Sequence, residues 1–304
     1  MGKIAFVFSG QGDQFPGMGK ALAQQYESAA KVFQMCDGLR PGTSLQCFEG
    51  TEEELKETKN TQPCLFAMEL AAAKVLCEAG IRPDAVAGFS LGEVTACTVA
   101  GVVEDETGFQ LVCKRGELMQ QAAEQCDTSM AAVVKLSQEK VEELCRNFKQ
   151  VYPVNFNCPG QITVAGLSIE MPEFSAAVKA AGGRAIPLKV KGGFHSPFMR
   201  KAADAFLLEL KKTTLRTPKA QLYSNVTAMP YGSCSMDEVQ LLAEQVCSPV
   251  RWENIIRNMI ADGVDTFIEV GPGKTLINMI GKIDGTVKVY SVSDLDKILA
   301  EVKA

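Results

Sequence analysis

Short apolar runs alternate with longer amphipathic stretches along most of the chain. Runs at residues 3–9, 85–87, 221–226 and 266–270 have the length and composition of buried strands. Apolar residues recur at helical spacing near residues 18–37, 63–79, 91–100, 105–126, 237–246 and 251–262. Strands that alternate with helices predict a parallel sheet covered by helices, so the fold class is α/β.

The pattern changes between residues 128 and 188. Strands are predicted at 130–136, 151–156, 162–165 and 184–188, with helices after Ser137 and at 169–181. This β-α-β-β-α-β order is typical of a ferredoxin-like unit. We therefore predict a large domain from residues 1–127 and 189–304, with residues 128–188 inserted as a small subdomain.

Composition excludes several classes of protein. The 304 residues carry 31 basic and 36 acidic side chains, and this net charge of −5 argues against nucleic-acid binding. No apolar run reaches the length of a membrane span, and the N-terminus lacks the features of a signal peptide. Eleven cysteines without a C-x-x-C pair and a single histidine argue against a metal site. We expect a cytoplasmic protein with reduced thiols and no metal.

The first candidate for chemistry is Ser90, in the sequence Gly88-Phe89-Ser90-Leu91-Gly92. A strand precedes this Gly-x-Ser-x-Gly motif and a helix follows it, which is the context of a nucleophile elbow. The glycines remove side chains that would collide across a sharp turn. The alternative is a chance motif in which Ser90 only caps the helix, but that leaves both glycines unexplained.

A nucleophilic serine needs a general base, and His195 is the only histidine of the chain. It follows Gly192-Gly193 and precedes Ser196-Pro197, a predicted helix start. A helix N-terminus disfavours imidazolium and would help to keep the ring neutral. A lone histidine is usually structural or on the surface, but these flanking residues favour catalysis.

Arg115 lies within the apolar stripe of the helix predicted at 105–126. A buried guanidinium needs a partner, and its fork matches a carboxylate. Two alternatives remain open: a structural salt bridge to an Asp or Glu, or a carboxylate that arrives with the substrate.

Motifs in the same order over essentially the whole chain resemble the malonyl-CoA:acyl-carrier-protein transacylases of fatty-acid and polyketide synthesis. They include Gly10-Gln11-Gly12, the Ser90 motif, Lys114-Arg115-Gly116 and Gly193-Phe194-His195-Ser196, together with segments 155–161, 248–252 and 269–273. The resemblance implies an α/β-hydrolase-like large domain with a ferredoxin-like insert.

The resemblance also implies a role for each matching residue. Ser90 would be the nucleophile, His195 its base, Gln11 and Leu91 the backbone donors of the oxyanion hole, and Arg115 the ligand of the malonyl carboxylate; the Gln245 carbonyl would orient His195, and Gln62 and Asn157 would lie at the substrate. The reaction implied is transfer of malonyl from malonyl-CoA to the phosphopantetheine thiol of acyl carrier protein, through a malonyl-serine ester and without a cofactor. We expect a monomer.

Two positions depart from the family pattern: Phe89 replaces the usual His, and Cys158 replaces the usual Ser. Because Phe89 adjoins the nucleophile, this departure bears on both the acyl selectivity and the rate that the family pattern would imply. One alternative is a serine esterase or acyl hydrolase that uses the same Ser-His pair with water. Another is a non-catalytic module that only docks carrier protein. Carrier proteins are acidic, so a local basic patch is expected in either case. Lys189, Lys191, Arg200 and Lys201 lie near His195 in the sequence, and the alternative for each is an ordinary solvated face.

Overall fold

The larger of two sheets forms the centre of the molecule. The computed structural model describes residues 2–302. Five parallel strands lie in the order β7 (Gln221–Leu222), β2 (Ala85–Gly88), β1 (Lys3–Phe8), β8 (Val264–Glu269) and β9 (Lys288–Ser291). The chain goes from β1 to β2 on one side and returns as β8 on the other. The strand order therefore reverses between β1 and β8, a usual place for a site in such sheets, and the loop after β1 begins there with the loop after β2 next to it.

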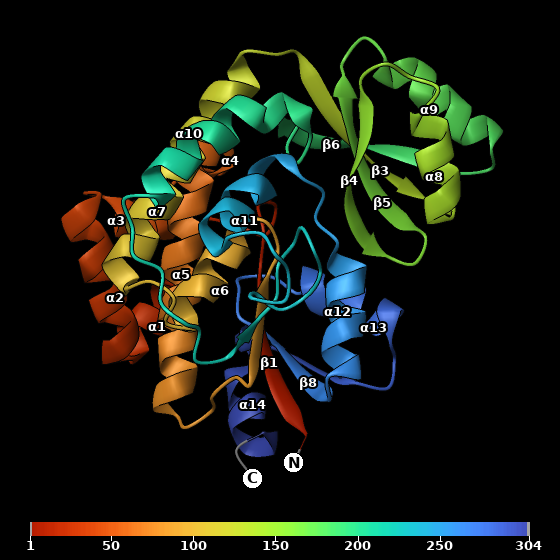
Figure 1. Cartoon of the computed structure of the whole chain (residues 1–304). Helices are drawn as coiled ribbons and strands as arrows, with labels where there is room; N and C mark the ends of the chain where they lie inside the picture. The colour runs from red at the N-terminus through yellow and green to blue at the C-terminus, as the bar shows by residue number, and fades with distance from the viewer. Residues whose placement is uncertain (1, 303–304) are drawn as a thin grey trace.

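Helices cover both faces of this sheet, as Figure 1 shows. In β1, Phe6 and Phe8 face one side while Ala5 and Val7 face the other, as the two-residue period of a strand requires. The first face belongs to a core that it shares with α6 (Leu91–Val99), which packs on β1 and β2, and with the helices outside it: α2 (Glu27–Leu39), α5 (Thr58–Glu78), α7 (Asp105–Glu124) and α10 (Arg200–Leu210). The second packs against α12 (Trp252–Ala261) and α13 (Thr275–Ile283).

Shorter helices connect these elements. They are α1 (Lys20–Gln25), α3 (Thr43–Glu49), α4 (Glu52–Lys56), η1 (Pro197–Met199), α11 (Glu238–Glu244), η2 (Gln245–Cys247), η3 (Val292–Asp294) and α14 (Leu295–Glu301). The single helix predicted at 18–37 is in fact α1 and α2, because Tyr26 between them is extended. The helix predicted from residue 63 begins at Thr58 and contains Pro63.

The smaller sheet is antiparallel and lies to the upper right in Figure 1. Its order is β4 (Val151–Cys158), β5 (Gln161–Leu167), β3 (Thr128–Val134) and β6 (Arg184–Lys191). Helices α8 (Gln138–Cys145) and α9 (Met171–Ala180) pack on it around a separate core that includes Phe174. The predicted order of elements is confirmed, and β6 continues to Lys191, past the expected boundary at 188.

Val250 joins the two units through its backbone. Its N–H donates to the Val154 carbonyl at 2.9 Å, and its carbonyl accepts from the Phe156 N–H at 2.9 Å. The segment that follows η2 is thereby paired with β4, which fixes the small sheet beside the loops of the large one.

The strand predicted at 221–226 ends at Leu222. Ser224 turns the chain out of the sheet: its N–H donates to the Met229 carbonyl at 3.0 Å, and its hydroxyl accepts from the Val226 N–H at 3.1 Å. Asn225 then lies buried next to the end of β2. Within residues 2–302, no helix has both the length and the apolar character required to cross a bilayer.

Candidate active site

Ser90 lies at the turn between β2 and α6, in a strained conformation. Its φ of 56° and ψ of −107° are unusual for a residue with a side chain and cost on the order of 1–3 kcal/mol. The turn closes because both flanking positions are glycine. A Cβ on Gly88 would lie 1.8 Å from the Gly92 carbonyl carbon, and one on Gly92 would lie 2.3 Å from the Phe8 oxygen. The structure thus forms the sharp strand–turn–helix that the motif predicts.

His195 reaches Ser90 from 105 positions further along the chain. Its Nε2 lies 2.7 Å from Ser90 Oγ, and its Nδ1 lies 2.9 Å from the Gln245 carbonyl oxygen. A carbonyl oxygen can only accept, so Nδ1 carries the ring proton and Nε2 is free to accept the Ser90 hydroxyl proton. His195 also has a positive φ, of 60°, so both members of the pair occupy strained backbone.

The local electrostatics keep His195 neutral. Burial, and then the positive charge of Arg115, lower the pKa of His195 from 6.5 to about 4. The helix start predicted after His195 is the three-residue turn η1, which leads directly into α10, and its contribution to the pKa stays a prediction. Ser196 does cap that turn, with its hydroxyl accepting from the Phe198 N–H at 3.3 Å.

Arg115 is almost fully buried on α7, with 1% of its surface exposed. Its Nη1 donates to Gln62 Oε1 at 2.8 Å, and its Nη2 donates to Gln245 Oε1 at 2.7 Å and to Ser90 Oγ at 3.2 Å. Its Nε has no hydrogen-bond partner among the described residues. Burial lowers the pKa of Arg115 to about 10, which leaves it charged at neutral pH.

The two alternatives for Arg115 are therefore separated by geometry. Its three contacts are to two amide oxygens and a hydroxyl, and within residues 2–302 it forms no salt bridge with an Asp or Glu. Glu93 influences its pKa only through space. A full positive charge is thus held beside the nucleophile without a fixed anionic partner. An anionic ligand would supply that partner.

Two backbone donors lie beside Ser90. Gln11 and Leu91 line the same cavity as Ser90, and the N–H groups of both lack an acceptor among residues 2–302. Leu91 begins α6, so its N–H points out of the helix N-terminus. The Gly10 backbone packs on Phe89, where a Cβ would lie 2.8 Å from the ring. Such a pair of N–H groups can stabilise an oxyanion.

The cavity at Ser90 is narrow, at about 90 Å³. Apolar side chains form much of its wall: Phe89, Met119, Met130, Leu188, Val190 and Phe194. Phe89, at the position of the family histidine, packs edge-on against Trp252 at 5.7 Å between ring centroids. It therefore contributes apolar wall and no titratable group beside Ser90.

Asn157 is not among the residues that line this cavity. Its Nδ2 donates to Thr163 Oγ1 at 3.2 Å inside the small subdomain, and its expected role at the substrate stays a prediction. Asn155, two residues earlier on β4, lines the cavity instead, with a buried Oδ1 that has no partner among the described residues. The pairing of β4 with β5 shifts register before Asn155 and again after Phe156, and such irregularities re-aim side chains, so the sequence alone does not say which Asn faces the cavity.

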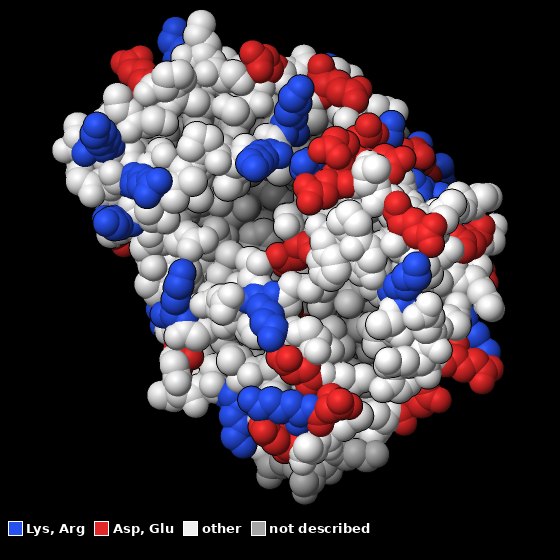
Figure 2. All heavy atoms as spheres, turned by 180° about the vertical axis from the view of Figure 1, so that it is seen from behind, with Lys and Arg blue, Asp and Glu red and all other residues white. Residues whose placement is uncertain are grey.

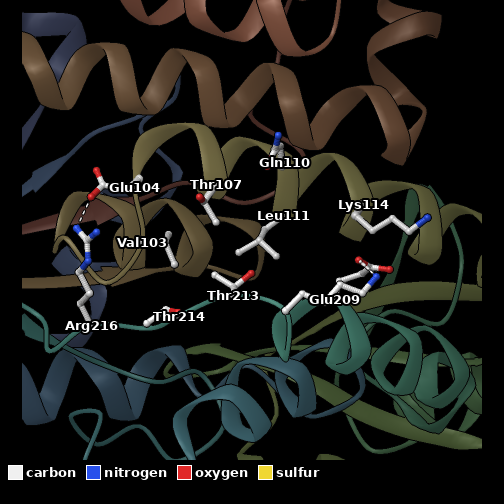
Figure 3. Close-up of a pocket in the computed structure, with 11 residues that line it drawn as sticks. Val103, Glu104, Thr107, Gln110, Leu111, Lys114, Glu209, Thr213, Thr214 and Arg216 are labelled. Atoms are coloured by element: carbon white, nitrogen blue, oxygen red, sulfur yellow. Dashed lines mark hydrogen bonds and ion pairs between the residues drawn. The ribbon is translucent and has the colours of Figure 1, made fainter.

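A larger hollow of about 460 Å³ lies elsewhere, between α7 and the segment that follows α10 (Figure 3). Leu111 points into it, and four of its charged side chains pair with one another, Glu104 with Arg216 and Glu209 with Lys212. Ser90, His195 and Arg115 are absent from its wall, so the candidate site is the smaller cavity.

Comparison with known proteins agrees with this geometry. Residues 5–292 match the family model described as the acyl transferase domain. The malonyl CoA-acyl carrier protein transacylase of Bacillus subtilis is 39% identical over 98% of this chain and 96% of its own length. The Haemophilus influenzae protein of the same name is 36% identical over 97% of this chain and 96% of its own.

Solved structures give the same result. The malonyl CoA-acyl carrier protein transacylase of Clostridium perfringens superposes with a TM-score of 0.95 at 34% identity, over 99% of this chain and 97% of its own. A malonyl-transacylase in complex with its type II PKS acyl-carrier protein superposes with a TM-score of 0.93 at 32% identity, over 99% of each chain. Full-length similarity in sequence and fold, with an elbow serine beside a histidine, shows that the chain is an acyltransferase and belongs to the malonyl-CoA:acyl-carrier-protein transacylase family.

Proposed function

We propose that the protein transfers a malonyl group from malonyl-CoA to the phosphopantetheine thiol of an acyl carrier protein. The observation that carries the proposal is the charged Arg115 guanidinium, 3.2 Å from Ser90 Oγ and without a carboxylate partner among the described residues. In a malonyl thioester a single CH₂ separates the carboxylate from the carbonyl carbon that is attacked. A cation close to the nucleophile therefore fits this short acyl group and can hold its carboxylate through a bidentate pair.

In the first half-reaction, His195 Nε2 takes the Ser90 hydroxyl proton as Oγ attacks the thioester carbon. The N–H groups of Gln11 and Leu91 stabilise the oxyanion. The C–S bond then breaks, and the imidazolium returns its proton to the CoA sulfur. The products are a malonyl ester on Ser90 and free CoA thiol.

In the second half-reaction the phosphopantetheine thiol gives its proton to His195 and attacks the ester carbon. The C–O bond to Ser90 breaks, and Oγ recovers the proton from His195. One acyl group has moved from one thiol to another, and all atoms and protons are accounted for without a cofactor. The names of the bacterial relatives and the complex with a carrier protein support both substrates.

Intact mass spectrometry tests the proposal. The wild-type protein should gain one malonyl group from malonyl-CoA and lose it when a phosphopantetheinylated carrier protein is added, whereas Ser90→Ala should gain none. Arg115→Ala should shift the preference from malonyl-CoA toward acetyl-CoA by about 100-fold, because the carboxylate loses its charge partner.

Lys114→Ala is the matched control. Lys114 is a cation on the same helix, but it pairs with Glu117 and lies outside the cavity of Ser90. The preference of Lys114→Ala for malonyl-CoA over acetyl-CoA should equal that of the wild type. A malonyl adduct on Ser90→Ala would refute the assignment of the nucleophile. Loss of the adduct to water rather than to carrier protein, with an unchanged preference in Arg115→Ala, would favour the hydrolase.

A further inference from the structure

A single side-chain amide spans the turn that carries Ser90. Asn225 Oδ1 accepts the Ser90 N–H at 2.8 Å, and Asn225 Nδ2 donates to the Gly88 carbonyl at 2.6 Å. Asn225 is fully buried and lies 135 positions after Ser90, in the loop that leaves the large sheet after β7. The amide thus bonds to the backbone on both sides of Phe89.

The other side of the Ser90 residue is held in a similar way. The Ser90 carbonyl accepts from the side chain of Gln245 at 2.5 Å, and Gln245 Nε2 also lies 3.5 Å from Asn225 Oδ1. Both backbone polar groups of the nucleophile are therefore bound by amides from elements that are distant in sequence. The conformation they hold, with φ at 56°, is one that an unsupported serine would leave.

Asn225 is itself fixed by a buried carboxyl group. Its N–H donates to Glu93 Oε2 at 3.3 Å, and the Tyr231 hydroxyl donates to Glu93 Oε1 at 2.6 Å. Glu93 has no exposed surface and belongs to the first turn of α6, which begins immediately after Ser90. The contacts form a closed ring from Ser90 through Asn225 and Glu93 back to the elbow.

We propose that Asn225 is a positioning residue for the transfer reaction, which holds the Ser90 backbone in its strained conformation, and that Glu93 and Tyr231 hold Asn225 in place. This inference rests on the proposed role of Ser90. Asn225 is not among the residues that line the cavity, so it acts through Ser90 and does not bind the acyl group. It keeps Oγ aligned with His195 Nε2 and beside the Leu91 N–H, and its loss should slow the chemical step without weakening substrate binding.

The test compares Asn225→Ala with Asn258→Ala. Asn258 donates to the Ala228 carbonyl at 2.9 Å, so it anchors the same loop without touching the elbow. Acylation of Ser90 is followed by intact mass under single-turnover conditions, once with malonyl-CoA and once with a fluorophosphonate probe that needs only an activated serine. The melting temperature of each variant is measured in parallel.

Asn225→Ala should be acylated about 10- to 100-fold more slowly by both reagents, since two hydrogen bonds to the elbow are lost. Its KM for malonyl-CoA should stay within about twofold of the wild type, because the contacts that bind the substrate before reaction are unaffected. Asn258→Ala should be acylated at a rate within about twofold of the wild type, even if its melting temperature falls as much as that of Asn225→Ala.

Wild-type rates in Asn225→Ala with both reagents, or a raised KM with an unchanged rate, would overturn the inference. So would an equal loss in Asn258→Ala. If the wild type is labelled by the probe but not by malonyl-CoA, the proposed substrate is wrong, and the probe rates still decide the role of Asn225.

Should Asn225→Ala not fold, Tyr231→Phe removes only the hydroxyl that binds Glu93. It should slow both acylations about two- to tenfold at unchanged KM, and unchanged rates would overturn the inference.

Discussion

At the scale of single residues, two groups that can carry positive charge lie beside the same hydroxyl and behave in opposite ways. Arg115 remains charged because its pKa, although lowered by burial, is about 10. His195 remains neutral because burial and the nearby Arg115 charge lower its pKa to about 4. The cation that would bind the substrate carboxylate therefore also keeps the base ready to accept a proton.

This coupling predicts the titration of His195. In the wild type the ring should titrate near pH 4, so kcat/KM should fall only as the pH drops through about 4, where Nε2 becomes protonated and can no longer accept the Ser90 proton. Arg115→Gln should raise the pKa of His195 because it removes a nearby positive charge, yet leave it below 6.5 because burial remains. His195 is the only histidine, so its ring signals in an NMR titration need no assignment. A wild-type ring that titrates near 6.5 would contradict this prediction.

At the scale of elements, the elbow depends on how closely β1, β2 and α6 approach one another. The place of Gly92 is set by the Phe8 carbonyl at the end of β1, which a Cβ would meet at 2.3 Å. Backbone atoms cannot swing aside as a flexible side chain can. The first turn of α6, and Ser90 with it, is therefore located by the end of the neighbouring strand.

Gly92→Ala should lower the free energy of unfolding by about 1–3 kcal/mol, because the added methyl group forces α6 away from β1. Gly281→Ala on α13 is the matched control: nothing lies within 4 Å of its added Cβ. That variant should be more stable by about 0.5–1 kcal/mol, as alanine is the better helix residue. Urea denaturation of both variants measures the difference, and equal midpoints would refute the steric account.

At the scale of the whole molecule, the net charge of −5 hides an uneven distribution. On the face that Figure 2 shows, Lys and Arg predominate on the side of the small sheet, at the upper left, and Asp and Glu gather on the opposite side. Lys189 and Lys191 are exposed on β6, next to Leu188 and Val190 of the cavity wall. Arg200, in contrast, is paired with Glu244. An acidic carrier protein would be attracted to the side of the small sheet.

Replacing both Lys189 and Lys191 by Glu should raise the KM for carrier protein about tenfold and leave the KM for malonyl-CoA within about twofold, because rim charges act on association. The effect should shrink at high salt, where such charges are screened. Lys288→Glu, on the edge strand β9 of the other sheet, should change neither constant. Steady-state transfer assays at two ionic strengths measure this, and an unchanged KM for carrier protein would exclude the β6 surface.

The sequence by itself determined the α/β architecture, the inserted small subdomain and the position of Ser90, because hydrophobic period and glycine spacing are local properties. It also singled out His195 and Arg115, since a lone histidine and a buried cation stand out in any fold. What it could not determine is which distant groups meet: Asn155 rather than Asn157 at the cavity, Asn225 at the elbow, and amide oxygens rather than a carboxylate at Arg115. Those pairings depend on where loops leave the two sheets, as at Leu222, and only the packed tertiary structure decides that.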